Sequence, residues 1–195
     1  MPPTFRVVLR TFATLPLLLT ACGDDNRPSY IRVNYPNGVM QFDGTPDPQF
    51  AQGLSNQFRL CAVNDPSPEA VYNDDETTAC VHLRISDTAL QTGPKEFKIA
   101  GTAVISPADP GTIPAVAFTA GATHSPEVQM VYISTICFGP GANQDTRQEV
   151  TGTLVLKENS QTKLKGRVVL QVKGTTADRC TGGDSEANLR FESEP

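Results

Sequence analysis

The chain has 195 residues, with 16 Lys and Arg against 21 Asp and Glu, so its formal net charge is −5 at pH 7. An acidic chain of this kind is poorly suited to binding nucleic acid or an anionic membrane surface through charge. Its hydrophobic content of 38% excludes a chain that is disordered throughout, and its length suffices for one ordinary domain with a core.

The chain begins with a segment that is typical of an export signal. Arg6 and Arg10 precede an apolar run at 11–19, which is shorter than the ~20 residues that a membrane-spanning helix needs. Residues 1–21 are therefore predicted to be a signal peptide that is removed. Removal takes both arginines and no acid, so 174 residues with a net charge of −7 would remain.

The end of this segment, Leu19-Thr20-Ala21-Cys22, resembles the lipobox of bacterial lipoproteins. The resemblance covers only the first 22 residues. It implies that Cys22 becomes the lipidated first residue of the mature protein, and several acyl chains anchor stably because each buried CH2 contributes about 0.8 kcal/mol. In lipoproteins that are sorted by the residue after the cysteine, Asp retains the protein in the inner membrane, so the resemblance implies that Gly23 favours the outer membrane where the cell has one. An ordinary secretory signal with an incidental Cys22 is the alternative.

After the lipobox, residues 22–29 are predicted to form the lipidated N-terminus and a flexible tether, because the residues after Cys22 are polar and include a Pro. Residues 30–195 are predicted to be one β domain. It opens with alternating residues at 30–34 and 39–42 around Tyr35-Pro36-Asn37-Gly38, a pattern that predicts a hairpin.

Two further strands are predicted at 56–63 and 79–86, after a loop at 43–54. A loop with five acids, 64–78, separates them, and we expect the two strands to pair as a long-looped hairpin. The predicted inward side chains are Phe58, Leu60, Ala62, Val81, Leu83 and Ile85, and the predicted outward ones are Arg59, Cys61, Cys80, His82 and Arg84.

The next segments also predict short strands. Residues 96–105 contain Gly101, which is interpreted as a bulge, and 113–120 contain Pro114, which favours a sheet edge. The run 127–138 is apolar and β-branched enough to predict a central, buried strand.

The strongest hairpin pattern lies at 149–157 and 162–173, and 186–192 is predicted to be the last strand. No stretch has helical periodicity for three turns. About ten short strands at this spacing predict a single antiparallel β-sandwich, with a β-barrel as the alternative.

Besides Cys22, the chain has Cys61, Cys80, Cys137 and Cys180. An even number in an exported protein favours two disulfides. Cys61 and Cys80 lie on the outward faces of strands that we expect to pair, so we predict Cys61–Cys80 and, by elimination, Cys137–Cys180, although the sequence permits three connectivities. A zinc site is disfavoured, because no Cys-x-x-Cys occurs and only two histidines are present.

The sequence identifies no catalytic residue and no cofactor. His124 is next to Ser125, but neighbours in sequence seldom face each other, and no Gly-x-Ser-x-Gly motif occurs. Both histidines are therefore expected to be ordinary surface residues. The one metal hypothesis is Ca²⁺ held by hard oxygen ligands in the acidic loop, with a solvated turn as the alternative. The candidate calcium ligands are Asp74, Asp75 and Glu76.

These observations favour a non-catalytic envelope lipoprotein that acts as a binding or accessory module for another envelope component. The expected partners are the membrane, through the lipid on Cys22, and an envelope protein, but not nucleic acid. One alternative is a hydrolase acting on envelope or extracellular polymers. The other is a surface adhesion or carbohydrate-binding protein, which is disfavoured because Trp is absent and only four Tyr are present.

Overall fold

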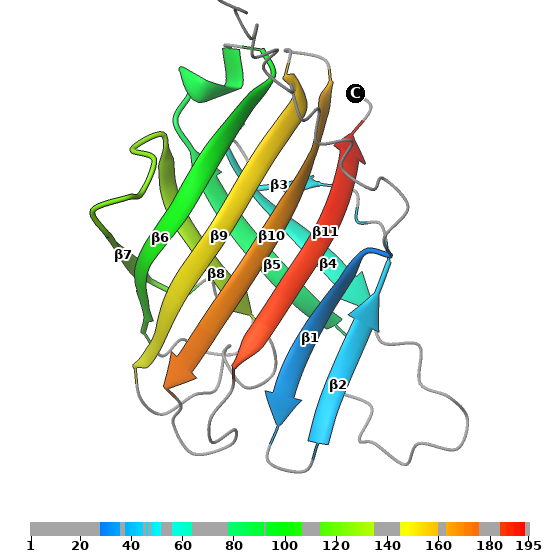
Figure 1. Cartoon of the computed structure of the whole chain (residues 1–195), viewed down its shortest axis with the longest axis vertical. Coiled ribbons are helices and arrows are strands. Elements are labelled where there is room, and N and C mark those ends of the chain that lie inside the picture. The colour runs from blue at the N-terminus through cyan, green and yellow to red at the C-terminus, as the bar shows by residue number, and fades with distance from the viewer. Residues whose placement is uncertain are drawn as a thin grey trace, which may run out of the picture.

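The computed structural model is an all-β domain (Figure 1). It describes residues 28–35, 38–44, 46, 48–51, 56–63, 78–91, 93–106, 114–134, 145–159, 163–175 and 184–193. The elements are β1 (Tyr30–Tyr35), β2 (Gly38–Asp43), β3 (Gln49–Phe50), β4 (Gln57–Val63), β5 (Thr78–Ile85), the 3-10 turn η1 (Ala89–Gln91), β6 (Lys95–Ile105), β7 (Val116–Ala120), β8 (Val128–Ser134), β9 (Thr146–Asn159), β10 (Leu164–Thr175) and β11 (Ser185–Ser193). In this described part, no helix is long and apolar enough to cross a membrane.

All the strands belong to one antiparallel sheet. Their order is β7-β6-β9-β10-β11-β1-β2-β4-β5-β8, and the short β3, within a segment predicted to be a loop, pairs with β4. The sheet bends into two layers: β6, β9, β10, β11, β1 and β2 lie in front of β3, β4, β5 and β8 (Figure 1). The layers are joined at β2 and β4, where Asp43 opposite Val63 is the one residue pair described. The predicted antiparallel all-β fold is confirmed.

Alternating side chains fill the space between the layers. The predicted inward residues of β4 and β5 are all buried, and β9 and β10 form the predicted hairpin. Each large apolar side chain that is fully buried contributes about 1.5–3 kcal/mol of transfer free energy. The largest of them are Phe42, Phe58, Phe97, Phe191, Ile31, Leu60, Leu83, Ile85, Ile133 and Leu154.

Two glycines allow close approach between neighbouring groups. Gly152 has a φ of +154°, and a Cβ at this position would collide with the carbonyl oxygen of Val169 on β10. Gly101, predicted to mark a bulge, instead lies in unbroken register with β7 and β9. Its missing side chain leaves room for the ring of Phe118.

The strand β8 is buried although it is last in the order of the sheet. Val131, Tyr132 and Ile133 are buried as predicted, but among the described strands β8 pairs only with β5, so the predicted central position is wrong. The fully buried side chain of Gln148, on β9, occupies the other edge. The Ile133 N–H donates to Gln148 Oε1 (2.9 Å), and Gln148 Nε2 donates to the Ile133 carbonyl oxygen (2.7 Å). One side-chain amide therefore replaces a neighbouring strand and connects β8 to the opposite layer.

Candidate functional site

The most unusual polar cluster lies on the outer surface of β4, β5 and β8, which we call the His82 face. The pairing of these strands aligns Arg59, His82 and Tyr132 in one row across the sheet. The adjacent row contains Cys61, Cys80 and Ser134, and Arg84 lies two residues beyond His82 on β5.

His82 is packed between neighbours and is not on an open surface. Its ring stacks on Tyr132 with centroids 4.3 Å apart and an interplanar angle of 6°, and its Nε2 lies 2.7 Å from Ser134 Oγ. Burial, and secondly the positive charge of Arg59, lower the pKa of His82 from 6.5 to about 4. His82 is therefore neutral at pH 7.

The predicted solvated face is present at Arg59 and Arg84, which are exposed, but His82 itself is half-buried because the adjoining outer face of β8 is covered. Tyr132 packs in a second small core, separate from the main one, and burial raises its pKa to about 12 although the charge of Arg59 opposes this shift. The residues around Tyr132 come from β6, β7 and β8: Ala103, Ile105, Val116, Phe118 and Met130. The β6–β7 hairpin thus shields one end of the His82 row from water.

The contact between His82 and Ser134 resembles half of a catalytic triad. A serine nucleophile needs a base whose second ring nitrogen is oriented by a third group. No carboxylate in the described residues forms a hydrogen bond with His82, and a base with a pKa of about 4 accepts protons weakly at neutral pH. The pair therefore suits a structural hydrogen bond better than general-base catalysis.

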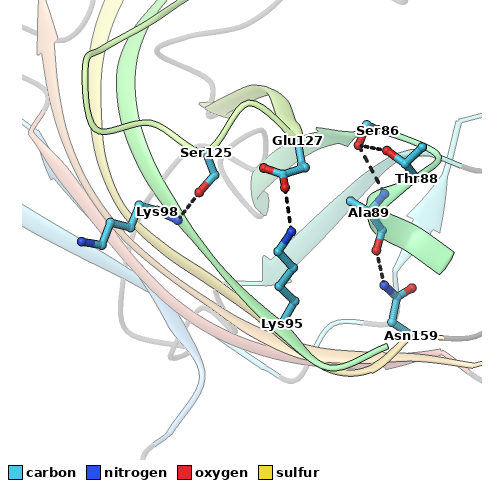
Figure 2. A network of polar contacts seen from close by, with 8 residues as sticks. All are labelled: Ser86, Thr88, Ala89, Lys95, Lys98, Ser125, Glu127 and Asn159. Carbon is cyan, nitrogen blue, oxygen red and sulfur yellow. Dashed lines mark hydrogen bonds and ion pairs between the residues drawn. The ribbon is translucent and has the colours of Figure 1, made fainter. Parts of the chain in front are cut away.

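The second histidine holds a loop against the sheet. The Ala100 N–H donates to His124 Nδ1 (3.0 Å), and His124 Nε2 donates to the Val128 carbonyl oxygen (2.5 Å). The adjacent Ser125 Oγ accepts the backbone N–H of Lys98 (2.9 Å), as Figure 2 shows. The side chains of His124 and Ser125 thus bond backbone groups and not each other. This pair therefore has a structural role.

Figure 2 also shows how this loop and η1 are tied to the ends of the strands. Lys95 Nζ lies 2.6 Å from Glu127 Oε1, and this hydrogen bond is the main reason why the pKa of Glu127 is lowered. On the other side, Asn159 at the end of β9 donates to the carbonyl oxygen of Ala89 in η1. These contacts stabilise one end of the domain and bring no reactive groups together.

The His82 face also differs from the rest of the molecule in charge. No Asp or Glu occurs in β3, β4, β5 or β8, whereas Arg59 and Arg84 are both exposed. Arg59 is oriented by its Nε, which donates to Gln49 Oε1 (2.8 Å). Several cations elsewhere in the sheet pair with carboxylates, as in the 2.6 Å contact between Arg32 and Glu186. The His82 face is therefore positively charged in a chain whose net charge is −5.

One predicted disulfide is present and directly adjoins this site. Cys61 and Cys80 are bonded across β4 and β5, where they are paired in register. The predicted partners Cys137 and Cys180 lie outside the described residues. The lipidation candidate Cys22 also lies outside them.

The predicted calcium ligands Asp74, Asp75 and Glu76 lie outside the described residues as well. Within the part of the chain that is described, no group of three or more His, Cys, Asp or Glu residues could hold a metal ion. Arg59 and Arg84 were not singled out as functional candidates from the sequence. They could have been found from the absence of Asp and Glu in the strands around them.

Comparisons with known proteins add no relative to this description. No protein-family model, no curated protein and no solved structure matches the chain.

Proposed function

We propose that the protein is a lipid-anchored accessory module of a bacterial cell envelope, which binds an anionic surface of another envelope component through Arg59 and Arg84. The observation that carries this proposal is the charge of the His82 face, where two exposed arginines lie on strands without a single acid. Guanidinium groups bind carboxylates and phosphates through paired hydrogen bonds. An anionic partner would also be attracted over some distance.

The anchor is proposed from the lipobox at Cys22, and an outer-membrane location from Gly23. The first strand begins at Tyr30, and a chain spans at most about 3.3–3.6 Å per residue, so the lipid could lie up to ~28 Å from β1. The strand β1 is paired on both sides, with β11 and β2. Arg32 reinforces it through Glu186 on β11 and Gln41 on β2. A tether attached there would enter the sheet at a well-held strand.

In-cell crosslinking of the tagged full-length chain, followed by mass spectrometry, tests this proposal. We expect a specific envelope partner that is lost with Cys22→Ala and reduced at least about tenfold with the double variant R59Q/R84Q, since two charge-assisted contacts are removed. The matched control is K98Q/K173Q, which removes two exposed cations from the opposite layer and should leave recovery unchanged.

Salt provides a second measurement, because contacts between exposed charges weaken as ionic strength rises. Recovery of the uncrosslinked complex should decrease as NaCl is raised from about 50 to about 500 mM, because the Debye length falls from above to below about 10 Å over this range. Equal recovery with R59Q/R84Q and the wild-type chain would contradict the anionic contact. A partner retained by Cys22→Ala would contradict the need for the anchor.

A hydrolase is the second candidate, and the 2.7 Å contact between His82 and Ser134 is the observation that favours it. A fluorophosphonate probe labels activated serines and decides between the two functions. We expect no labelling, because the lowered pKa of His82 makes it a weak base. Labelling that disappears in Ser134→Ala would establish the hydrolase instead.

A further inference from the structure

The strand β7 ends the sheet, and in the described part of the chain only one of its two backbone edges is paired with a strand. The Gly121 N–H donates to the Ala100 carbonyl oxygen (2.7 Å), which sets the phase of the ladder with β6. Hydrogen-bonded pairs alternate along an antiparallel ladder. The backbone groups of Val116, Phe118 and Ala120 therefore point away from β6.

Within the residues that the structure describes, this free edge lacks the sequence features that usually prevent strand pairing. Edge strands are commonly protected by Lys, Pro or a bulge, but β7 has no charged residue and no Pro, and its register with β6 is unbroken. Ala117, Thr119 and Ala120 are exposed. Val116 and Phe118 pack against the small core around Tyr132, so β7 is held in place while its edge remains open.

The absence of charge from β7 makes its edge compatible with a second copy of the chain. The net charge of −5 makes two copies repel each other over most of their surfaces. A two-fold interface brings the same strand of two copies together, so a charged residue in that strand would lie close to the same charge on the other copy. β7 avoids this repulsion. The edge of β2 is joined to β4 at Asp43, and the edge of β8 is bonded to Gln148.

We propose that two copies of the chain associate through β7, antiparallel to each other, about a two-fold axis at Phe118. This register overlaps all five residues of both strands. Val116 then faces Ala120 of the second copy, Ala117 faces Thr119 of the second copy, and the outward backbone groups form about six hydrogen bonds. One sheet continues across both molecules, and every side chain at the junction is uncharged.

Charge exchange tests the register as well as the association. Two differently tagged full-length chains are co-expressed, extracted in detergent, and captured through one tag. Wild-type copies should capture each other. A117K/T119K should fail to capture itself, with recovery at least about tenfold lower, because like charges directly opposite each other destabilise strand pairing. A117E/T119E should behave in the same way, whereas the Lys variant and the Glu variant should capture each other.

Two further variants separate pairing from folding. Thr151→Lys places the same charge on an exposed position of β9, two strands from the edge, and should leave capture unchanged. Ala120→Pro removes an outward N–H but no bond to β6, and should lower capture about tenfold with little change in melting temperature. Failure of wild-type copies to capture each other would overturn the proposal, as would normal self-capture of A117K/T119K.

Discussion

Replacing Gln148 with leucine tests whether one buried amide holds β8 in place. Gln148 is fully buried, and its two hydrogen bonds satisfy both backbone groups of Ile133. Leucine fills a similar volume but leaves a buried N–H and a buried carbonyl without a partner, each at about 1–3 kcal/mol. We therefore expect the free energy of unfolding to fall by about 3 kcal/mol, after a small gain from the added apolar surface.

Urea denaturation followed by circular dichroism measures this loss. With an m-value of ~2 kcal/mol per M, the midpoint should fall by about 1.5 M. The matched control is Gln129→Leu, at an exposed position on β8, which should change the free energy of unfolding by less than about 0.5 kcal/mol. A midpoint for Gln148→Leu within ~0.3 M of the wild-type value would refute the bridging role.

Gln148→Glu gives a pH-dependent version of the same test. A protonated carboxyl can accept from the Ile133 N–H and donate to the Ile133 carbonyl oxygen, whereas a carboxylate would face that oxygen as a buried charge. Folding should therefore raise the pKa of the introduced group above its unfolded value. The variant should be most stable below the unfolded pKa and lose stability as pH rises through the folded pKa. Constant stability between pH 4 and 8, a range of about 4 units that begins near the reference carboxyl pKa, would contradict this reasoning.

Three other predictions concern single features of the fold. Gly152→Ala should lower stability by at least about 2 kcal/mol, and the control Gly38→Ala by ~1 kcal/mol. Both glycines have positive φ, but only the Cβ added at residue 152 collides with a neighbouring group. Equal losses of stability in thermal melts would refute the collision. Breaking the disulfide by Cys80→Ala should cost about 3 kcal/mol for its 19-residue separation, and an unchanged melting temperature would contradict this. Folding lowers the pKa of His82 from 6.5 to about 4, so the folded state should keep its full stability above pH ~6.5. It should lose up to about 3 kcal/mol of stability as pH falls from ~6.5 to ~4. An NMR titration midpoint of His82 near the ordinary histidine value would refute the buried environment.

The positions of most strands could be predicted because alternation is a local property. In β4 and β5 the inward residues follow a period of two, and the polar loop between them marks where the chain turns. The Cys61–Cys80 bond followed from the same pattern, since strands adjacent in the sequence commonly pair and both cysteines occupy the outward face. Local sequence thus determined the fold class and one covalent link.

The candidate site could be predicted only in part. The outward direction of Arg59, His82 and Arg84 was predictable from the strand pattern, and the structure places Arg59 and Arg84 on an exposed face. The partial burial of His82 was not predictable, because the hairpin that covers its neighbour Tyr132 comes from β6 and β7, which do not pair with β5.

By itself, the sequence determined the positions of most strands and which face of each predicted strand is apolar. Only the tertiary structure decided that β8 ends the strand order while remaining buried, that Gln148 completes its edge, and that His82 becomes half-buried. The physical reason is that hydrophobic alternation acts over neighbouring residues, whereas these features depend on two layers that meet only when the whole sheet bends.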